Sequence, residues 1–447
     1  MRIIPPELGK DDIDGFKIND IFELKRFGES LRNIYANVSH PLVAMLDAPW
    51  GSGKTTFVKM WCGMLRNEGF PVIYFDAFAN DYLDDPFAAL AGEIMALAKP
   101  QESVDSRKIE NFKKASKGVG KKLFRIGGKV GIKALTLNLL DSEDLENLKS
   151  VPNDLAKEFS EVGDRYLEEL LEERNEEKNL FSEFKDALES LATDLGQVKG
   201  EATQKPLVIV IDELDRCRPP FSLGVIEKIK HFFSVEGVHF LLVTNVKQLE
   251  SMIRLEYGLG SESNLYLHKF YHVIFNIPPG LQISRRKQKY INYIYESFPK
   301  DESGGTYTSA LATEITRIAE ARDLSYREID RIVAVISILV LATRKDRIGD
   351  TALIVGLCAM KVVSSVLYEK ARNKTLTYEE VENFLALNSG GYDDYYRDAW
   401  RMCLIRDYEA GQDRFKSTYR VRDFRSRHDI LPLYCRFIDN IQIPDSP

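Results

Sequence analysis

"PLVAMLDAPWGSGKTT", residues 41–56, is the stretch that decides the fold. A short apolar run at 42–46 precedes a glycine-containing loop, and residues with helical spacing follow the loop. Phosphate oxygens need several backbone N–H donors pointing inward, and a tight loop supplies them where glycines allow positive φ. The N-terminal dipole of the following helix adds to the attraction for anions. The stretch therefore predicts a strand, a phosphate-binding loop and a helix in succession.

The loop matches the chemistry of triphosphate binding except at one position. The usual pattern is G-x-x-x-x-G-K-[S/T], and Ala48 stands where the pattern has its first glycine. Lys54 would place charge on the terminal phosphates, and the hydroxyl of Thr55 would ligate Mg²⁺. Because Ala48 belongs to the turn that leaves the strand, we expect the exchange to cost little. The predicted nucleotide-binding residues are Trp50, Gly51, Ser52, Gly53, Lys54, Thr55 and Thr56.

A second motif, "VIVIDELDR" at 208–216, places two acids at the end of a continuous apolar run. Such a run is typical of a parallel strand buried on both faces, and ligands sit at the carboxyl ends of parallel strands. We expect Asp212 to orient Mg²⁺ together with Thr55. Glu213, the next residue, can polarise a water for in-line attack on the γ-phosphate. A nucleoside triphosphate and Mg²⁺ are therefore the expected ligands, and hydrolysis of the γ-phosphate is the expected reaction.

Apolar runs alternate with helical patterns along the chain, which indicates an α/β fold with a parallel sheet. The fourth run, "VHFLLVTN", ends in the polar residue Asn245. It is a candidate to position the attacking water, and an ordinary polar cap after a strand explains it equally well. The five runs lie at 41–46, 71–78, 206–212, 238–245 and 271–279.

Two motifs together, "APWGSGKTT" (48–56) and "IDELDRCRP" (211–219), resemble the KAP family of P-loop NTPases, which favours a tryptophan before GSGK. Softer matches are "YLHKFYHVIFNIPP" (266–279) and "LSYREIDRIV" (324–333). The resemblance spans roughly residues 16–340. It implies an additional-strand, catalytic-glutamate ATPase with a five-stranded, mainly parallel sheet ordered 5-1-4-3-2, a helical insertion and a C-terminal helical lid. It also implies ATP hydrolysis coupled to assembly or signalling, and relatives occur in bacterial anti-phage defence.

The resemblance also suggests further site residues. It assigns Asp215 and Arg216 to the edge of the active site. It points to Lys269 as a finger that acts on the nucleotide of a neighbouring subunit. Arg327 and Arg331 become lid residues that contact phosphate, although a solvated helix face with i,i+4 pairing explains these two arginines equally well.

Composition divides the chain into five predicted parts. The parts are a first section of the NTPase core (1–100), a basic and then acidic helical insertion (101–204), a second section of the core (205–282), a helical lid domain (283–390) and a Tyr/Arg-rich tail (391–447).

The insertion begins with an unusual basic segment. Residues 107–133 hold ten Lys or Arg against one acid, although the formal net charge of the whole chain is -7. This segment suits contact with nucleic-acid phosphates, an anionic membrane or another subunit. Neutralisation by the acidic helix that follows, at 168–173, is slightly favoured because the charges are adjacent in sequence. The basic and aromatic tail segment 413–428 suits stacking on bases and a protein interface equally.

Five widely spaced cysteines make neither a zinc motif nor a disulfide framework, which fits a reducing cytosol. The N-terminus has no apolar run of the kind found in signal peptides. The longest apolar runs are shorter than the roughly 18 residues that a membrane span needs. We expect a cytoplasmic protein without a transmembrane segment, either fully soluble or peripheral to a membrane, that works as a homo-oligomer or with a protein partner.

Two other functions compete with an ATPase. One is a nucleotide-gated scaffold for nucleic acid, membrane or protein with little turnover. The other is a small-molecule kinase, which has no use for the water-activating carboxylate of Glu213.

Overall fold

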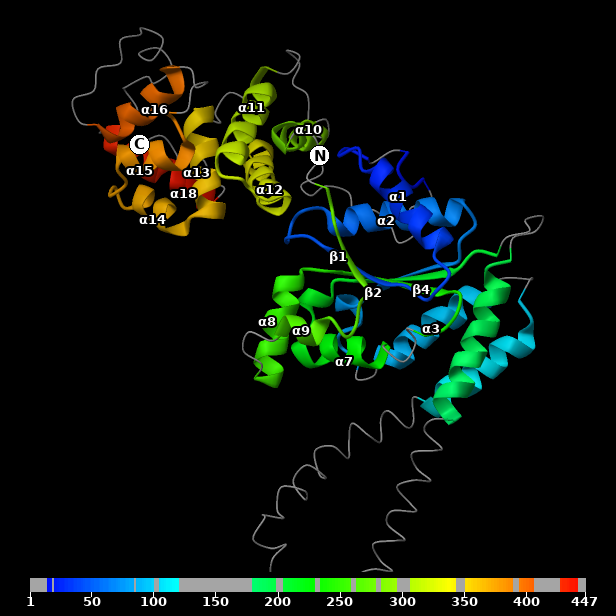
Figure 1. Cartoon of the computed structure of the whole chain (residues 1–447). Helices are drawn as coiled ribbons and strands as arrows, with labels where there is room; N and C mark the ends of the chain where they lie inside the picture. The colour runs from blue at the N-terminus through cyan, green and yellow to red at the C-terminus, as the bar shows by residue number, and fades with distance from the viewer. Residues whose placement is uncertain are drawn as a thin grey trace, which may run out of the picture.

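The computed structural model describes residues 14–17, 20–83, 86–99, 104–119, 179–197, 204–229, 234–258, 263–278, 283–295, 306–342, 350–388, 394–405 and 427–440. These residues form one five-stranded sheet that lies between two layers of helices (Figure 1). Its strands are β1 (Val43–Asp47), β2 (Val72–Asp76), β3 (Leu207–Asp212), β4 (Val238–Thr244) and β5 (Val273–Asn276).

The strand order is β2-β3-β4-β1-β5, and every pair of neighbours is parallel. This confirms the predicted order 5-1-4-3-2. All residues of β3 and β4 are buried, as their mainly apolar sequences require, whereas β5 is a half-exposed edge strand. The carboxyl ends of β1 and β3, where the two sequence motifs begin, lie on the same edge of the sheet with β4 between them.

Helices cover both faces of the sheet, and alternate strand residues serve the two layers. Val43 and Met45 of β1 pack into one core, whereas Ala44 and Leu46 pack into the other. Figure 1 shows α1 and α2 on one face and α3, α7, α8 and α9 on the opposite face. The bounds are α1 (Lys25–Asn37), α2 (Lys54–Asn67), α3 (Pro86–Ala98), α7 (Pro219–Ile229), α8 (Val246–Tyr257) and α9 (Ser263–Leu267).

The two described ends of the predicted insertion, 104–119 and 179–197, are helical and pack beside α3. The ring of Phe184 lies 5.5 Å from that of Phe112 and 5.2 Å from that of Phe87 in α3. Lys108 and Asp194 form a 2.7 Å ion pair between the two ends. The remainder of the insertion, with most of the basic segment and its acidic neighbour, lies outside the described residues.

The helices after β5 share one hydrophobic core of their own. In α13 every residue from Ala352 to Met360 is buried, so the apolar run "ALIVGLCAM" is a core helix. Trp400 and Phe437, from the part of the sequence after 390, belong to the same core. The bounds are α10 (Ile283–Tyr295), α11 (Thr306–Ala321), α12 (Tyr326–Ala342), α13 (Thr351–Val363), α14 (Ser365–Arg372), α15 (Tyr378–Leu385), α16 (Asp394–Leu404) and α18 (Ile430–Asn440).

Among the described residues, no helix combines the length and the apolar character that a membrane crossing demands. The division into five parts given in the previous section stays a prediction.

A buried acid in this helical core makes stability depend on pH. Glu314 of α11 is 1% exposed, and burial raises the pKa of its carboxyl from 4.5 to about 7. The folded state therefore holds this proton more tightly than the unfolded state, so the stabilisation is complete below pH 4.5 and is lost as the pH rises through 7. Relative to Glu314→Gln, the wild type should lose up to about 3 kcal/mol of unfolding free energy between pH 5 and 8.

Urea unfolding of both proteins across this range measures the effect. Glu320→Gln, which changes an exposed acid of the same helix, is the matched control and should follow the wild type. A pH-independent difference between the wild type and Glu314→Gln would contradict the assignment.

Candidate nucleotide-binding and catalytic site

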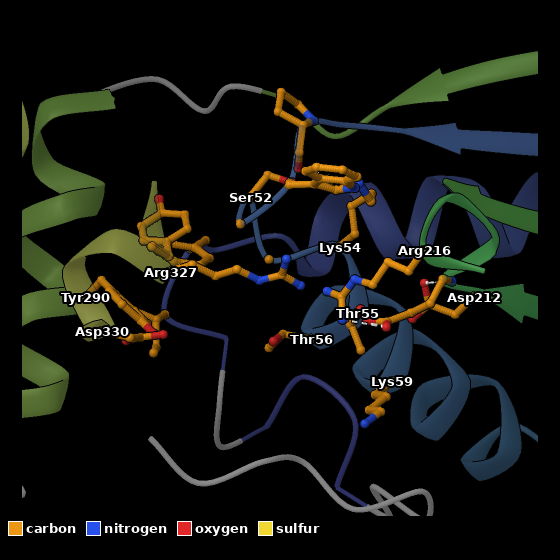
Figure 2. Close-up of a pocket in the computed structure, with 18 of the residues that line it drawn as sticks. Ser52, Lys54, Thr55, Thr56, Lys59, Asp212, Arg216, Tyr290, Arg327 and Asp330 are labelled. Carbon is orange, nitrogen blue, oxygen red and sulfur yellow. Dashed lines mark hydrogen bonds and ion pairs between the residues drawn. The ribbon is translucent and has the colours of Figure 1, made fainter. Parts of the chain in front are cut away.

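A pocket of about 350 Å³ lies where the carboxyl edge of the sheet meets α10 and α12 (Figure 2). One end is polar and holds both sequence motifs, and the other end is aromatic. All seven predicted nucleotide-binding residues line the pocket, together with both predicted acids. The lining residues are Ile21, Phe22, 49–56, Lys59, Asp212, Glu213, Asp215, Arg216, Tyr290, Tyr293, Tyr326, Arg327 and Asp330.

The glycine loop has the backbone that a phosphate cradle requires. Gly51 and Gly53 have φ of +73° and +87°, a region that residues with a side chain rarely adopt. Gly53 is the N-cap of α2 and makes no side-chain cap, so the first N–H groups of that helix have no side-chain acceptor there. The buried hydroxyl of Ser52 has no hydrogen-bond partner among the described residues. These groups can all be satisfied by an anion.

Ala48 does not disturb this loop. Its side chain is buried, it does not line the pocket, and it is not among the described residues with positive φ. An alanine is therefore tolerated at this turn without strain, as the sequence predicts.

Lys54 begins α2 and is 9% exposed. Its ammonium donates to the carbonyl oxygens of Ala48 and, at 3.4 Å, of Pro49. Burial lowers the pKa of Lys54, and the nearby carboxylates of Asp215 and Asp212 oppose that shift. The amine of Lys54 therefore lies at the polar end of the pocket, bonded to the loop carbonyls and near two carboxylates.

Asp212 ends β3 and is 1% exposed. One carboxylate oxygen accepts from the hydroxyl of Tyr74 at 2.9 Å, and the other accepts from the backbone N–H of Glu213 at 2.8 Å. Burial raises the pKa of Asp212 to about 6, against these hydrogen bonds, which lower it. Tyr74 was not predicted as a site residue; the only signal was a hydroxyl-bearing aromatic in the strand that pairs with β3.

Glu213 follows with φ of +63° and precedes a short 3₁₀ turn, η3 (Leu214–Arg216). Its carboxylate contacts both motifs: Oε1 accepts from the hydroxyl of Thr55 at 3.2 Å, and Oε2 lies 2.6 Å from the guanidinium of Arg216. Burial raises the pKa of Glu213, and Arg216 opposes the shift. The predicted base and the predicted magnesium ligand Thr55 are therefore hydrogen-bonded neighbours.

Trp50 connects the loop to the acidic turn. Its indole N–H donates to the carboxylate of Asp215, which is 3% exposed. The tryptophan before GSGK and the third acid of "DELD" are 165 residues apart in sequence, yet they meet in one contact. This hydrogen bond therefore joins the loop motif directly to the acidic motif.

The opposite end of the pocket is an aromatic cluster, Phe22, Tyr290 and Tyr326. Phe22 stacks on Tyr326 with centroids 4.7 Å apart, and Tyr290 meets Tyr326 edge-on at 4.8 Å. The hydroxyl of Tyr290 donates to Asp330 at 2.7 Å. Sequence reasoning missed this cluster because its residues come from distant segments and no local spacing marks them.

The first turn of α12 contacts the phosphate loop. The backbone N–H of Tyr326 donates to the carbonyl of Gly51 at 3.1 Å. A Cβ built on Gly51 would lie 3.0 Å from that of Ser325, so loop and lid turn approach closely. Arg327 lines the pocket, and Figure 2 shows its side chain extending between Ser52 and Thr56. Arg331, one turn further along, is exposed and does not line the pocket.

These geometric features agree with the family comparison. The KAP family P-loop domain matches residues 25–342 of the 447. The chain belongs to the KAP family of P-loop NTPases. The KAP match covers both nucleotide motifs, the sheet and helices α10 to α12, and it identifies a nucleotide-binding NTPase domain.

Two other comparisons add little to the KAP assignment. A search of curated proteins found no match. Among solved structures, the chain is similar to the Aeropyrum pernix ORC2 protein in its ADP form, with 14% identity, a TM-score of 0.35, and coverage of 99% of this chain and 97% of that one.

Two further predicted residues of this KAP domain do not line the pocket. Asn245 is the N-cap of α8 and accepts from the backbone N–H of Gln248 at 3.4 Å. Lys269 is exposed, with its ammonium 5.2 Å from the ring centroid of Tyr266. Their roles as water-positioning residue and as finger toward another subunit stay predictions.

Proposed function

We propose that the pocket binds ATP with Mg²⁺ and hydrolyses it. One observation carries the proposal: the carboxylate of Glu213 lies within hydrogen-bond distance of Thr55 in the phosphate loop. A terminal phosphate on this loop would have a carboxylate beside it that can take a proton from water.

The phosphate loop supplies binding and charge. Its glycines present backbone N–H groups, and Lys54 and the α2 N-terminus supply positive charge. Arg327 adds a second cation from the lid side.

The donor set fits Mg²⁺ bound through a nucleotide. The described residues hold no group of three or more His, Cys, Asp or Glu that could bind a metal by themselves. Thr55 and Asp212 instead offer oxygen ligands, and Mg²⁺ commonly uses one or two protein oxygens together with substrate phosphates and water. When bound, the ion would neutralise charge on the phosphates. Asp212, buried and fixed by Tyr74, keeps one orientation for this task.

The aromatic cluster Phe22, Tyr290 and Tyr326 is the proposed base site. A flat base can stack there while its phosphates reach the loop, because both ends belong to one pocket. Phe22→Ala should weaken ATP affinity about tenfold by removing one stacking face.

Equilibrium titration measures this change. Phe78→Ala removes an aromatic ring that is 52% exposed and outside the pocket, so it should bind ATP as the wild type does. Equal affinity of the Phe22→Ala and Phe78→Ala variants would remove the base site from this end of the pocket.

Turnover would be coupled to the lid. The backbone bond from Tyr326 to Gly51 makes the start of α12 sensitive to the loop conformation. We propose that this link transmits nucleotide state to an assembly, either a homo-oligomer in which Lys269 reaches a neighbour or a complex with another protein, in the cytoplasm. A role in anti-phage defence fits such a coupled ATPase.

A nucleotide-gated binding module with little turnover is the second candidate. It is favoured by the engagement of both carboxylate oxygens of Glu213, one by Thr55 and one by Arg216. Product analysis with labelled ATP tests the hydrolase against a kinase: ADP and free phosphate support the proposal, and label on any third compound contradicts it. ATP that stays intact would favour the module.

A further inference from the structure

The turn after β3 holds an ion pair inside the pocket. Arg216 and Glu213 are three residues apart, and their side chains approach to 2.6 Å with 30% and 12% exposed. Thr55 engages the second carboxylate oxygen at 3.2 Å. Figure 2 shows Arg216 and Thr55 close together on the side of the pocket that holds Asp212. The base that hydrolysis needs is thus paired with a cation of its own turn.

The turn itself is firmly held, so Arg216 is the part that can move. Trp50 bonds to Asp215, and the hydroxyl of Ser222 donates to the carbonyl of Leu214 at 2.6 Å. The backbone N–H of Arg216 donates to the carbonyl of Glu213 at 3.1 Å. The long Arg216 side chain lines the same pocket as Lys54. Rotation of that side chain alone would move its guanidinium from Glu213 toward a phosphate on the loop.

A terminal phosphate is a stronger partner for this arginine than one carboxylate is. It carries up to two negative charges and several acceptor oxygens, and the guanidinium fork suits such oxygens. The next arginine, Arg218, forms an ion pair outside the pocket, with its Nε 2.9 Å from the carboxylate of Asp81. Arg216 is therefore the arginine of this turn that is available to the nucleotide.

We propose, resting on the function proposed above, that Arg216 distinguishes nucleoside triphosphate from diphosphate by exchanging partners. With a terminal phosphate in the pocket, Arg216 bonds to that phosphate and leaves Glu213, whose oxygen then faces the attacking water. With a diphosphate, Arg216 stays on Glu213. The exchange makes Arg216 a specificity-determining residue and restricts use of the base to the triphosphate state.

The affinity ratio between ADP and a non-hydrolysable ATP analogue tests the exchange in the full chain with Mg²⁺. Arg216→Gln should bind the analogue about tenfold more weakly and ADP within about twofold of wild type, since a charge-assisted hydrogen bond is lost only with the terminal phosphate. Arg216→Lys, which keeps the charge without the fork, should fall between these values. Arg218→Gln is the matched control and should keep the wild-type ratio.

A double-mutant cycle with Glu213→Gln separates partner exchange from simple charge neutralisation. If Arg216 leaves Glu213 when the triphosphate binds, the Glu213 carboxylate competes with the phosphate for this arginine. Arg216→Gln should then reduce the preference for the ATP analogue over ADP by a larger factor in the Glu213→Gln background than in the wild type. If Arg216 only neutralises Glu213, Arg216→Gln should reduce that preference by a smaller factor in the Glu213→Gln background.

Two results overturn the inference. One is an unchanged ratio of ATP-analogue to ADP affinity in Arg216→Gln, and the other is a smaller effect of Arg216→Gln on this ratio in the Glu213→Gln background. The ADP affinity of each variant reports that its site is folded. Wild-type protein that binds neither nucleotide overturns the proposed function as well. Wild-type binding and hydrolysis with an unchanged ratio in Arg216→Gln overturns the partner exchange alone.

Discussion

Replacing Glu213 by glutamine is expected to leave ATP bound and to slow its hydrolysis by about 10²–10⁴-fold, the usual contribution of a general base. An amide keeps the shape of the side chain and can still accept from Thr55, which donates to Glu213 at 3.2 Å. It cannot take a proton from water. Nucleotide affinity should stay within a few fold or rise, because a negative charge beside the phosphates is removed.

The measurement pairs an ATP-binding titration with a single-turnover hydrolysis rate for each protein. Glu227→Gln is the matched control, since Glu227 lies outside the pocket and accepts from Tyr257 at 2.6 Å. Hydrolysis by Glu213→Gln at the wild-type rate would remove this glutamate from the mechanism.

Replacing Lys54 by alanine is expected to abolish detectable hydrolysis and to weaken ATP binding by at least about tenfold. The loss follows from the removal of charge-assisted bonds to the phosphates, which contribute about 1.5–3 kcal/mol each. Lys54 is 9% exposed and its ammonium already lies at the polar end of the pocket, bonded to carbonyl groups of the loop itself.

Lys54→Ala also leaves the carbonyl of Ala48 without its donor, so thermal unfolding must be measured beside binding. Lys247→Ala, an exposed lysine on α8, is the control for loss of a positive charge. Unchanged ATP affinity in a folded Lys54→Ala protein would show that the nucleotide binds elsewhere.

The parts of the site that could be predicted from the sequence are those in which neighbouring residues of one short segment act together. A phosphate cradle needs contiguous backbone N–H groups, so residues 50–56 carry their own signature. A buried strand that ends in acids is equally local, and Asp212 and Glu213 do line the pocket with the loop. The strand order came from the family resemblance and is confirmed by the four parallel pairs of neighbouring strands.

The aromatic end could not be predicted because tertiary structure alone assembles it. Phe22 precedes the first strand, whereas Tyr290 and Tyr326 belong to separate helices beyond the last one. In its local sequence, each of these aromatic residues looks like an ordinary residue of the hydrophobic core. The pairing of Trp50 with Asp215 is of the same kind, since neither motif shows that the other lies beside it.

Several predictions fall where the structure offers no test. Most of the basic segment, from residue 120, and the arginine-rich stretch 406–426 lie outside the described residues. Contacts with nucleic acid, an anionic membrane or another subunit through these segments stay predictions.

Single-turnover hydrolysis tests the central claim most directly. Wild-type protein in excess over ATP labelled on the γ-phosphate, with Mg²⁺, should release the label as free phosphate, while Glu213→Gln in parallel should retain intact ATP. Recovery of intact bound ATP from the wild type over the same interval would contradict the account.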